Sequence, residues 1–332
     1  MGFAPRNHRI EHPTSAPAPC RQHPARPERP AANSAPTPHA LSARPTLATL
    51  GAMSVFVSAE TLHEHIKSGK RQTVLASLWE AKSGQSWSKF QSEHIPTAVF
   101  CDPASQLTGM PGRRGGRNPL PDVETLRRAV RAWGVEPGRP VFIYDGGNGL
   151  FAARAWWVLR WAGIEDVSIL DGGFAEWDAR GLPTVAGPGN VVVPRQVEIS
   201  TGHLPTAEME EVREFEGLLV DARSQRRFQG RREILDLQAG HIPGAVNLPV
   251  GDLFEEDSNA VKPAEEIRER LAEVGITQDS DPADAIFYSG SGNHSALLLA
   301  AMAHAGLPVP RHYIGGWSQW SANPGNPVST DL

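Results

Sequence analysis

The sequence predicts an α/β protein built from two copies of one unit, and three observations support this prediction. A strand, a Gly-rich loop and an apolar helix occur in residues 142–163 and again in residues 286–306. Each copy is followed by a Gly-Gly-aromatic-x-x-Trp phrase and preceded by a His-Ile-Pro-x-Ala-Val phrase, which starts at His94 and at His241. A repeat of about 145 residues is a domain duplication rather than a solenoid. We therefore expect function to depend on where the two copies differ.

The first copy alternates short apolar strands with helices. Residues 54–58 read as the first ordered stretch, and Ser58 is expected to cap a helix over residues 59–67. Strands separated by helices of this length indicate a mostly parallel sheet with helices on both faces. Further strands are expected over residues 73–76, 98–100, 140–144 and 167–170, and further helices over 123–133 and 152–162.

The second copy repeats this order after a Pro/Gly-rich stretch. Its strands are expected over residues 218–220, 245–247, 285–288 and 312–314, and its helices over 264–274 and 294–305. We place the first domain at residues 53–187, a linker at 188–204 and the second domain at 205–330.

Residues 1–52 are rich in Pro, Ala, Arg and His without apolar periodicity, so we expect a disordered extension. Its few acids faintly resemble a transit peptide, but we favour an upstream start codon, with Met53 beginning the working protein.

Composition excludes several classes of function. A net charge of -5 argues against binding to nucleic acid or to an anionic membrane. The two cysteines, Cys20 and Cys101, lie in unlike surroundings, so we expect no disulfide and a reducing, cytoplasmic location. Neither cysteine has neighbours at the spacing of zinc ligands, so no metal is expected.

The loops after the two strongest strands are the candidate sites, because open parallel sheets bind ligands at the carboxyl ends of their strands. Residues 289–294, Ser-Gly-Ser-Gly-Asn-His, can curl successive N–H groups around an anion at a helix N-terminus. The same glycines also suit a tight turn with no ligand. Residues 147–152 fit the dinucleotide pattern G-x-G-x-x-A, with Asp171 after the next strand. We reject a dinucleotide site because Asp145 would oppose a pyrophosphate, and because the duplication accounts for the glycines.

Taken together, the tandem His-Ile-Pro phrases, the loop that opens with Asp145, the Tyr288-Ser-Gly-Ser-Gly loop and the closing Gly-Gly-aromatic-x-x-Trp phrases resemble two-domain rhodanese-like sulfurtransferases. The resemblance covers residues 54–330 and implies two tandem rhodanese-like domains. A Cys-Gly-Ser-Gly loop is typical of the 3-mercaptopyruvate type, whereas members that use thiosulfate carry a basic residue there. The resemblance implies no cofactor, because the enzyme itself carries the transferred sulfur.

The resemblance places the site in the second domain. Ser289 stands at the position of the nucleophilic cysteine, Ser291 matches the loop serine, and His94 matches a first-domain histidine that faces the loop. His94 also has a structural interpretation, because His241 occupies the same place in the second domain. Substrate binding is assigned to Arg227, Gly290, Gly292, Asn293, His294 and Trp317. Arg231 or Arg232 is expected to supply a second cation, and the loop 113–117 either rims the cleft or is solvated.

The implied function is transfer of a sulfane sulfur from 3-mercaptopyruvate, or from thiosulfate, to a thiol or cyanide through a loop persulfide. A serine cannot form a persulfide, so we expect the chain with Ser289 to be inactive. The sequence does not decide whether Ser289 is natural or introduced. The alternative is a non-catalytic binding or regulatory module. A phosphatase would need a Cys and an Arg in the loop, and a serine hydrolase would need the G-x-S-x-G register, which the loop lacks.

Overall fold

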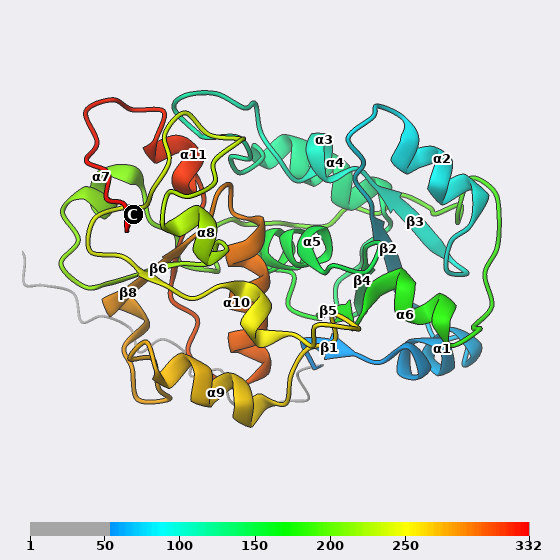
Figure 1. Ribbon diagram of the computed structural model, residues 1–332. Coiled ribbons are helices and arrows are strands. Elements are labelled where there is room, and N and C mark those ends of the chain that lie inside the picture. Colours follow the sequence, from blue (N-terminus) through cyan, green and yellow to red (C-terminus); the bar gives the residue numbers. More distant parts are fainter. Residues whose placement is uncertain (1–53, 332) are drawn as a thin grey trace, which may run out of the picture. The chain divides into compact units, whose positions relative to one another are not determined.

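The computed structural model describes residues 54–331 (Figure 1). The expected disordered extension, the start at Met53 and Cys20 all lie outside these residues. Within them the predicted fold class is confirmed, since two parallel sheets are each flanked by helices.

The first sheet contains five parallel strands in the order β1-β5-β4-β2-β3. Each predicted strand is present, with bounds shifted by one residue at most. The strands are β1 (Phe56–Val57), β2 (Thr73–Ser77), β3 (Ala98–Cys101), β4 (Val141–Tyr144) and β5 (Val167–Leu170).

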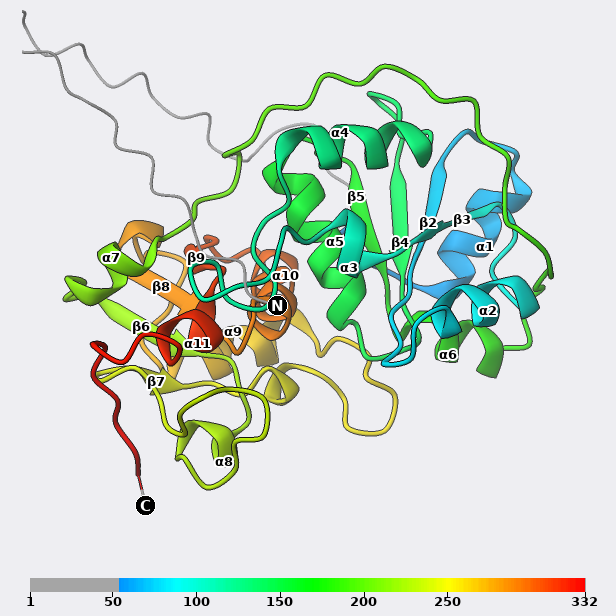
Figure 2. The same cartoon turned by 90° about the horizontal axis from the view of Figure 1, so that it is seen from above.

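Helices cover both faces of this sheet, as Figure 2 shows. One face packs against α1 (Ala59–Lys67), α2 (Gln85–Ser92) and α6 (Gly173–Ala179). The other packs against α4 (Val123–Ala132) and α5 (Leu150–Trp161), and a short helix α3 (Pro103–Gln106) follows β3. The predicted cap of α1 is confirmed, because the Ser58 side chain accepts a hydrogen bond from the backbone of Thr61.

The second sheet contains four parallel strands in the order β7-β6-β8-β9. They are β6 (Leu218–Asp221), β7 (Val246–Asn247), β8 (Ala285–Tyr288) and β9 (Arg311–Tyr313). One face packs against α7 (Met209–Arg213), α8 (Gln225–Phe228) and α11 (Gly316–Trp320). The other packs against α9 (Ala264–Ala272) and α10 (Asn293–His304), and two 3-10 turns are η1 (Val250–Leu253) and η2 (Pro282–Asp284).

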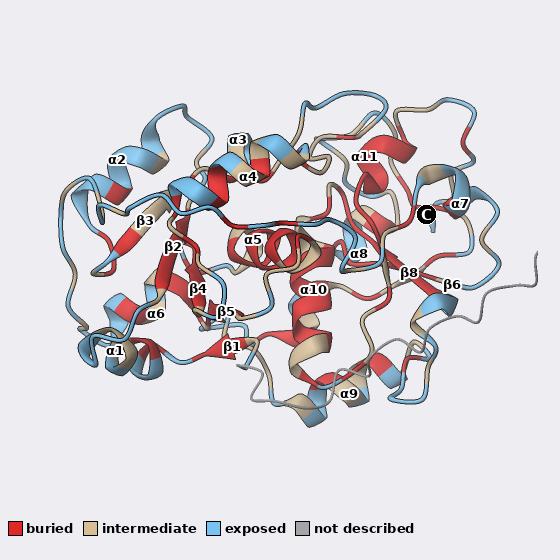
Figure 3. Cartoon of the chain, turned by 180° about the vertical axis from the view of Figure 1, so that it is seen from behind, coloured by how far each residue is buried: buried red, intermediate tan, exposed pale blue. Residues whose placement is uncertain are grey.

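The helices α5 and α10 pack directly against each other and join the two halves. Both are apolar on almost every side, and most of their residues are buried (Figure 3). Their side chains belong to one hydrophobic core that includes residues of both sheets. A helix that is hydrophobic all round is buried on all sides. Because α5 follows β4 and α10 follows β8, this packing brings the two Gly-rich loops to the same boundary.

No helix or strand is present between Ala179 and Met209, and the expected linker at 188–204 lies inside this segment. Part of the segment folds back on the first half, since the backbone of Val185 pairs with that of His94. No helix in the described part of the chain is long and apolar enough to span a membrane.

Candidate active site

The loop between β8 and α10 is held from behind by the helix α11. The carbonyl groups of Ser289 and Gly290 each accept a backbone hydrogen bond at 2.8 Å, from the N–H groups of Trp317 and Ser318. This close approach requires Gly316, because a Cβ there would lie 2.2 Å from the Ser289 carbonyl oxygen. The closing Gly-Gly-aromatic phrase therefore fastens the loop.

The loop presents backbone N–H groups around position 289. Gly292 adopts a left-handed conformation with a φ of 86° and caps α10, and its N–H donates to Ser289 Oγ at 3.2 Å. The N–H groups of residues 290, 291, 293 and 294 have no acceptor among residues 54–331. These groups, with the positive end of the α10 dipole, form a cradle for an anion.

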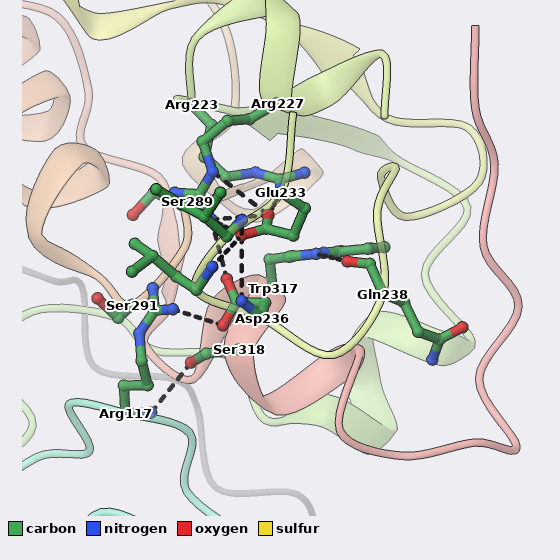
Figure 4. Close-up of polar contacts among 12 residues, drawn as sticks. Arg117, Arg223, Arg227, Glu233, Asp236, Gln238, Ser289, Ser291, Trp317 and Ser318 are labelled. Atoms are coloured by element: carbon green, nitrogen blue, oxygen red, sulfur yellow. Dashed lines mark hydrogen bonds and ion pairs between the residues drawn. The ribbon is translucent and has the colours of Figure 1, made fainter. Parts of the chain in front are cut away.

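Two guanidinium groups lie directly over this cradle. A Cβ placed on Gly290 would lie 3.0 Å from Nη2 of Arg117 and 3.2 Å from Nη1 of Arg227. Arg227 comes from α8, whereas Arg117 comes from an irregular segment of the first half. Both arginines donate to Asp236, and Arg227 also donates to Glu233 at 2.8 Å (Figure 4). The mouth of the loop therefore has two cations supplied by different halves.

A third arginine stiffens the base of the site. Arg223 is fully buried and pairs with Asp221 at 2.6 Å, and its guanidinium lies 4.7 Å from the centre of the Trp317 ring. Burial lowers the pKa of Arg223, but the charge and hydrogen bond of Asp221, together with Tyr288 and Glu233, outweigh it and the net shift is upward. Trp317 is itself fully buried and donates to the carbonyl of Gln238 at 2.9 Å. The structure thus places Trp317 behind the site as support.

A cavity of about 340 Å³ adjoins the loop and is shared by the two halves. Burial, and then Arg227, lower the pKa of His294 in its wall to about 4, so this imidazole is neutral at pH 7. The lining residues that bear on the site are Asn148 and Leu150 from the first half and Arg223, Arg227, His294 and Leu297 from the second.

Ser291 has a partner that sequence reasoning missed. Asn118 Nδ2 donates to Ser291 Oγ at 2.9 Å, and the neighbouring Arg117 N–H donates to Ser318 Oγ at 3.0 Å. The basic run 113–117 was the sequence signal for this contact. Of its two interpretations, a rim of the cleft or a solvated loop, the first applies to Arg117. By contrast, Arg231 and Arg232, expected as the second cation, are exposed and make no ion pair in the described chain.

The structure does not bring His94 to the loop. Its ring is buried, bonds through Nδ1 to the Phe90 carbonyl at 2.7 Å and stacks on the Phe90 ring. His241 repeats this arrangement with Phe228, at 2.9 Å. No hydrogen bond joins His94 to residues 289–294 within the described residues. These contacts favour the structural interpretation of both histidines.

The first loop is filled by its own side chain. Burial raises the pKa of Asp145, and hydrogen bonds from backbone N–H groups oppose that shift. Asp171, the residue that completed the dinucleotide pattern, accepts from Val261 N at 2.8 Å. The four donors to the Asp145 carboxylate are the N–H groups of Gly147, Gly149, Phe151 and Ala152, at 2.9, 3.1, 3.0 and 3.3 Å.

No thiol lies at either loop in the described part of the chain. Cys101 is fully buried in β3, and this burial raises its pKa far above the ordinary value. Among residues 54–331 no three His, Cys, Asp or Glu side chains form a group that could hold a metal ion.

Two tandem parallel sheets, with a loop of unpaired N–H groups after a central strand of the second, define a two-domain α/β protein. The family model described as "Rhodanese-like domain" matches residues 58–180 and 205–323, and the chain belongs to this family.

Similar proteins are named as sulfurtransferases. A probable 3-mercaptopyruvate sulfurtransferase of Pseudomonas aeruginosa is 38% identical over 250 residues, which cover 73% of this chain and 86% of that protein. A putative thiosulfate sulfurtransferase SseB of Mycobacterium tuberculosis is 33% identical, covering 82% of this chain and 96% of the relative. The structure of SseA, a 3-mercaptopyruvate sulfurtransferase from Escherichia coli, is 30% identical with a TM-score of 0.67, covering 80% of this chain and all of that one.

Proposed function

We propose that this protein is a sulfurtransferase scaffold of the 3-mercaptopyruvate type, with position 289 as the reacting position. The observation that carries the proposal is the cradle of free N–H groups beneath Arg117 and Arg227. A small donor with a carboxylate at one end and sulfur at the other matches this arrangement, because arginine binds carboxylates bidentately.

The chemistry of this scaffold requires a thiolate at position 289. The thiolate attacks the donor sulfur, the donor's carbon–sulfur bond breaks, and the enolate of pyruvate leaves and takes up a proton. The sulfur stays as a persulfide until a thiol or cyanide attacks its outer atom and the sulfur–sulfur bond breaks. The N–H cradle and the helix dipole stabilise the thiolate and the persulfide anion. With Ser289 this sequence cannot begin, and the buried Cys101 offers no substitute.

Donor binding would exchange one carboxylate for another. Asp236 now bridges Arg117 and Arg227. Burial raises the pKa of Asp236 in spite of Arg117, so its charge is less stable here than in water. A substrate carboxylate that takes its place would leave the two guanidiniums paired and let Asp236 return to solvent.

The test is sulfide release from 3-mercaptopyruvate in the presence of a thiol acceptor. We expect the unaltered chain and Ser289→Ala to be silent and Ser289→Cys to be active, because only the last supplies a thiolate in the cradle. The same variants are assayed with thiosulfate and cyanide to rank the donors. A folded Ser289→Cys protein that neither releases sulfide from 3-mercaptopyruvate nor forms thiocyanate from thiosulfate and cyanide would contradict the proposal.

Ser289 itself favours the second candidate, a non-catalytic module that binds a small anion without turnover. The two candidates separate on one comparison. Under the first, Ser289→Cys turns over the donor. Under the second, the unaltered chain binds 3-mercaptopyruvate or pyruvate in calorimetry while every variant at position 289 stays silent.

A further inference from the structure

A buried chain of hydrogen bonds leads from the reacting position into the core of the second half. Ser289 Oγ lies 3.1 Å from Ser295 Oγ, which lies 2.7 Å from Nε2 of His312. All three side chains are fully buried. Ser295 belongs to the first turn of α10 and His312 to β9, so regular elements fix both behind the loop.

The charge and tautomer of His312 determine which atoms donate and which accept in this chain of hydrogen bonds. Burial, and then the charge of Arg154, lower the pKa of His312 well below its ordinary value, so the ring is neutral. Nδ1 of His312 and Nη1 of Arg154 are both buried without a partner among the described residues. A bare Nδ1 lone pair is favoured near a cation, whereas an Nδ1–H there would be repelled. We therefore assign the proton to Nε2, which donates to Ser295.

We propose that His312 and Ser295 form a chain of hydrogen-bond donors that ends on the atom at position 289 and stabilises negative charge there. The Nε2–H group donates to Ser295 Oγ, and the Ser295 hydroxyl donates to the atom at position 289. This inference rests on the proposed function, in which a thiolate and then a persulfide carry that charge. Ser295 touches the reacting atom, whereas His312 is a positioning residue that acts through it.

The charge of Arg154 acts in the same direction. Its Nε and Nη2 donate only to backbone carbonyls, and no carboxylate pairs with it among the described residues. A Cβ placed on Gly292 would lie 3.2 Å from its Nη1. An uncompensated cation of the first half therefore lies behind the loop. The other ionisable groups around position 289, which the test leaves unchanged, are Arg117, Arg223, Arg227, Asp221, Glu233, Asp236, His294 and Tyr288.

The test measures a thiol pKa and needs no turnover. In the Ser289→Cys protein, the rate of alkylation by iodoacetamide at position 289 is followed against pH by peptide mass spectrometry, which separates this site from Cys20 and Cys101. Adding Ser295→Ala should raise the thiol pKa by about one, because a hydrogen bond to a charged group is lost. Ser295→Thr keeps a hydroxyl and should restore the pKa.

Two further comparisons separate this role from general packing. Ser77→Ala removes another fully buried hydroxyl, which bonds to the Phe151 carbonyl at 2.8 Å, and should leave the thiol pKa unchanged. His312→Gln keeps an N–H donor near the place of Nε2 and should hold the pKa near its parent value, whereas His312→Leu should raise it.

An unchanged thiol pKa in Ser295→Ala would overturn the proposal. An unchanged thiol pKa in His312→Leu would show that His312 does not act through Ser295. Ala at position 295 suits the fold, since Ala152 holds the matching position in the first half. Ser289→Cys protein that fails to release sulfide, yet shows the expected pKa changes, refutes the proposed function and leaves this inference standing.

Discussion

The two Gly-rich loops of this protein differ in how the N–H groups at the start of the following helix are paired. In the first half, the strand-to-helix N–H groups are satisfied internally by the Asp145 carboxylate. In the second half, the residue after the strand is Ser289, which accepts from one N–H group and leaves its neighbours free. A strand-to-helix loop can therefore be closed by its own carboxylate or kept open for a foreign anion, and the residue after the strand differs accordingly.

The surroundings of the loops differ as much as the loops. A Cβ on Gly290 would meet Arg117 and Arg227, whereas one on Gly146 would meet no described residue within 4 Å. Counted from the glycine that caps each helix, Phe151 of the first half stands where the second has His294. The second loop therefore differs from the first in having cations above it and polar side chains around it.

The largest expected effect is on stability, when the carboxylate that closes the first loop is removed. Asp145→Ala leaves four backbone N–H groups without their acceptor and should lower the free energy of unfolding by about 3 kcal/mol. Urea unfolding measures this, with Asp178→Ala, an exposed aspartate of the same half, as the control expected to change it by less than about 0.5 kcal/mol. Equal urea midpoints for the parent and Asp145→Ala would mean that the carboxylate does not close the loop.

The next effect sharpens the role of the cations over the second loop. In the Ser289→Cys protein, Arg227→Gln should raise the KM for 3-mercaptopyruvate by about 100-fold, the value of one lost bidentate charged contact. Arg117→Gln should raise it by about tenfold, because the Arg117 side chain is 33% exposed against 17% for Arg227.

The control for these arginines is Arg113→Gln. Arg113 is exposed, and among residues 54–331 it donates only to the Ala322 carbonyl, so its loss should leave KM unchanged. Steady-state kinetics separate KM from kcat in all three variants. A KM for Arg227→Gln within twofold of its parent would show that the carboxylate binds elsewhere.

The smallest effect concerns pH and the residue that replaces Phe151 in the second loop. The pKa of His294 is lowered from 6.5 to about 4 in the folded protein, first by burial and then by Arg227. Between pH 6.5 and pH 4 the unfolded chain binds the His294 proton more tightly than the folded protein does. The free energy of unfolding is therefore not reduced by this proton at pH 7, and it decreases as the pH falls.

Urea unfolding at pH 7 and pH 5 checks this expectation. His294→Gln should lose about 2 kcal/mol less stability than the parent on going from pH 7 to pH 5. The same loss in both proteins would mean that His294 is already open to solvent and protonates normally. His304, whose pKa burial also lowers, is present in both proteins and cancels in the comparison.

The fold and the core of the site could be read from the sequence because their signals are local. Buried strands show as apolar runs, α5 and α10 as apolar helices, and the Gly-Gly phrase reports a real close approach at Gly316. The helices of four to eight residues were missed, since so few residues, as in the four of α8, display little periodicity.

The remaining parts of the site depend on contacts between distant segments. Arg117 and Asn118 lie in irregular backbone and reach the loop only because α5 packs on α10. Arg227 pairs with Glu233 and Asp236. No sequence pattern distinguishes these two acids from acidic residues exposed to solvent. The chain from Ser289 to His312 crosses from a helix to a strand, so sequence spacing does not reveal it.

The packing of α5 on α10 also bears on the history of the duplication. A duplicated gene first yields two units that can each fold alone, and such units can later be separated or shuffled. Here the two central helices are apolar on the sides that they present to each other, and one hydrophobic core runs through both sheets. Either half in isolation would expose that apolar surface to water, at a cost of about 25 cal/mol for each Å². We therefore expect neither copy to be stable without the other, although the repeat indicates that they arose by duplication.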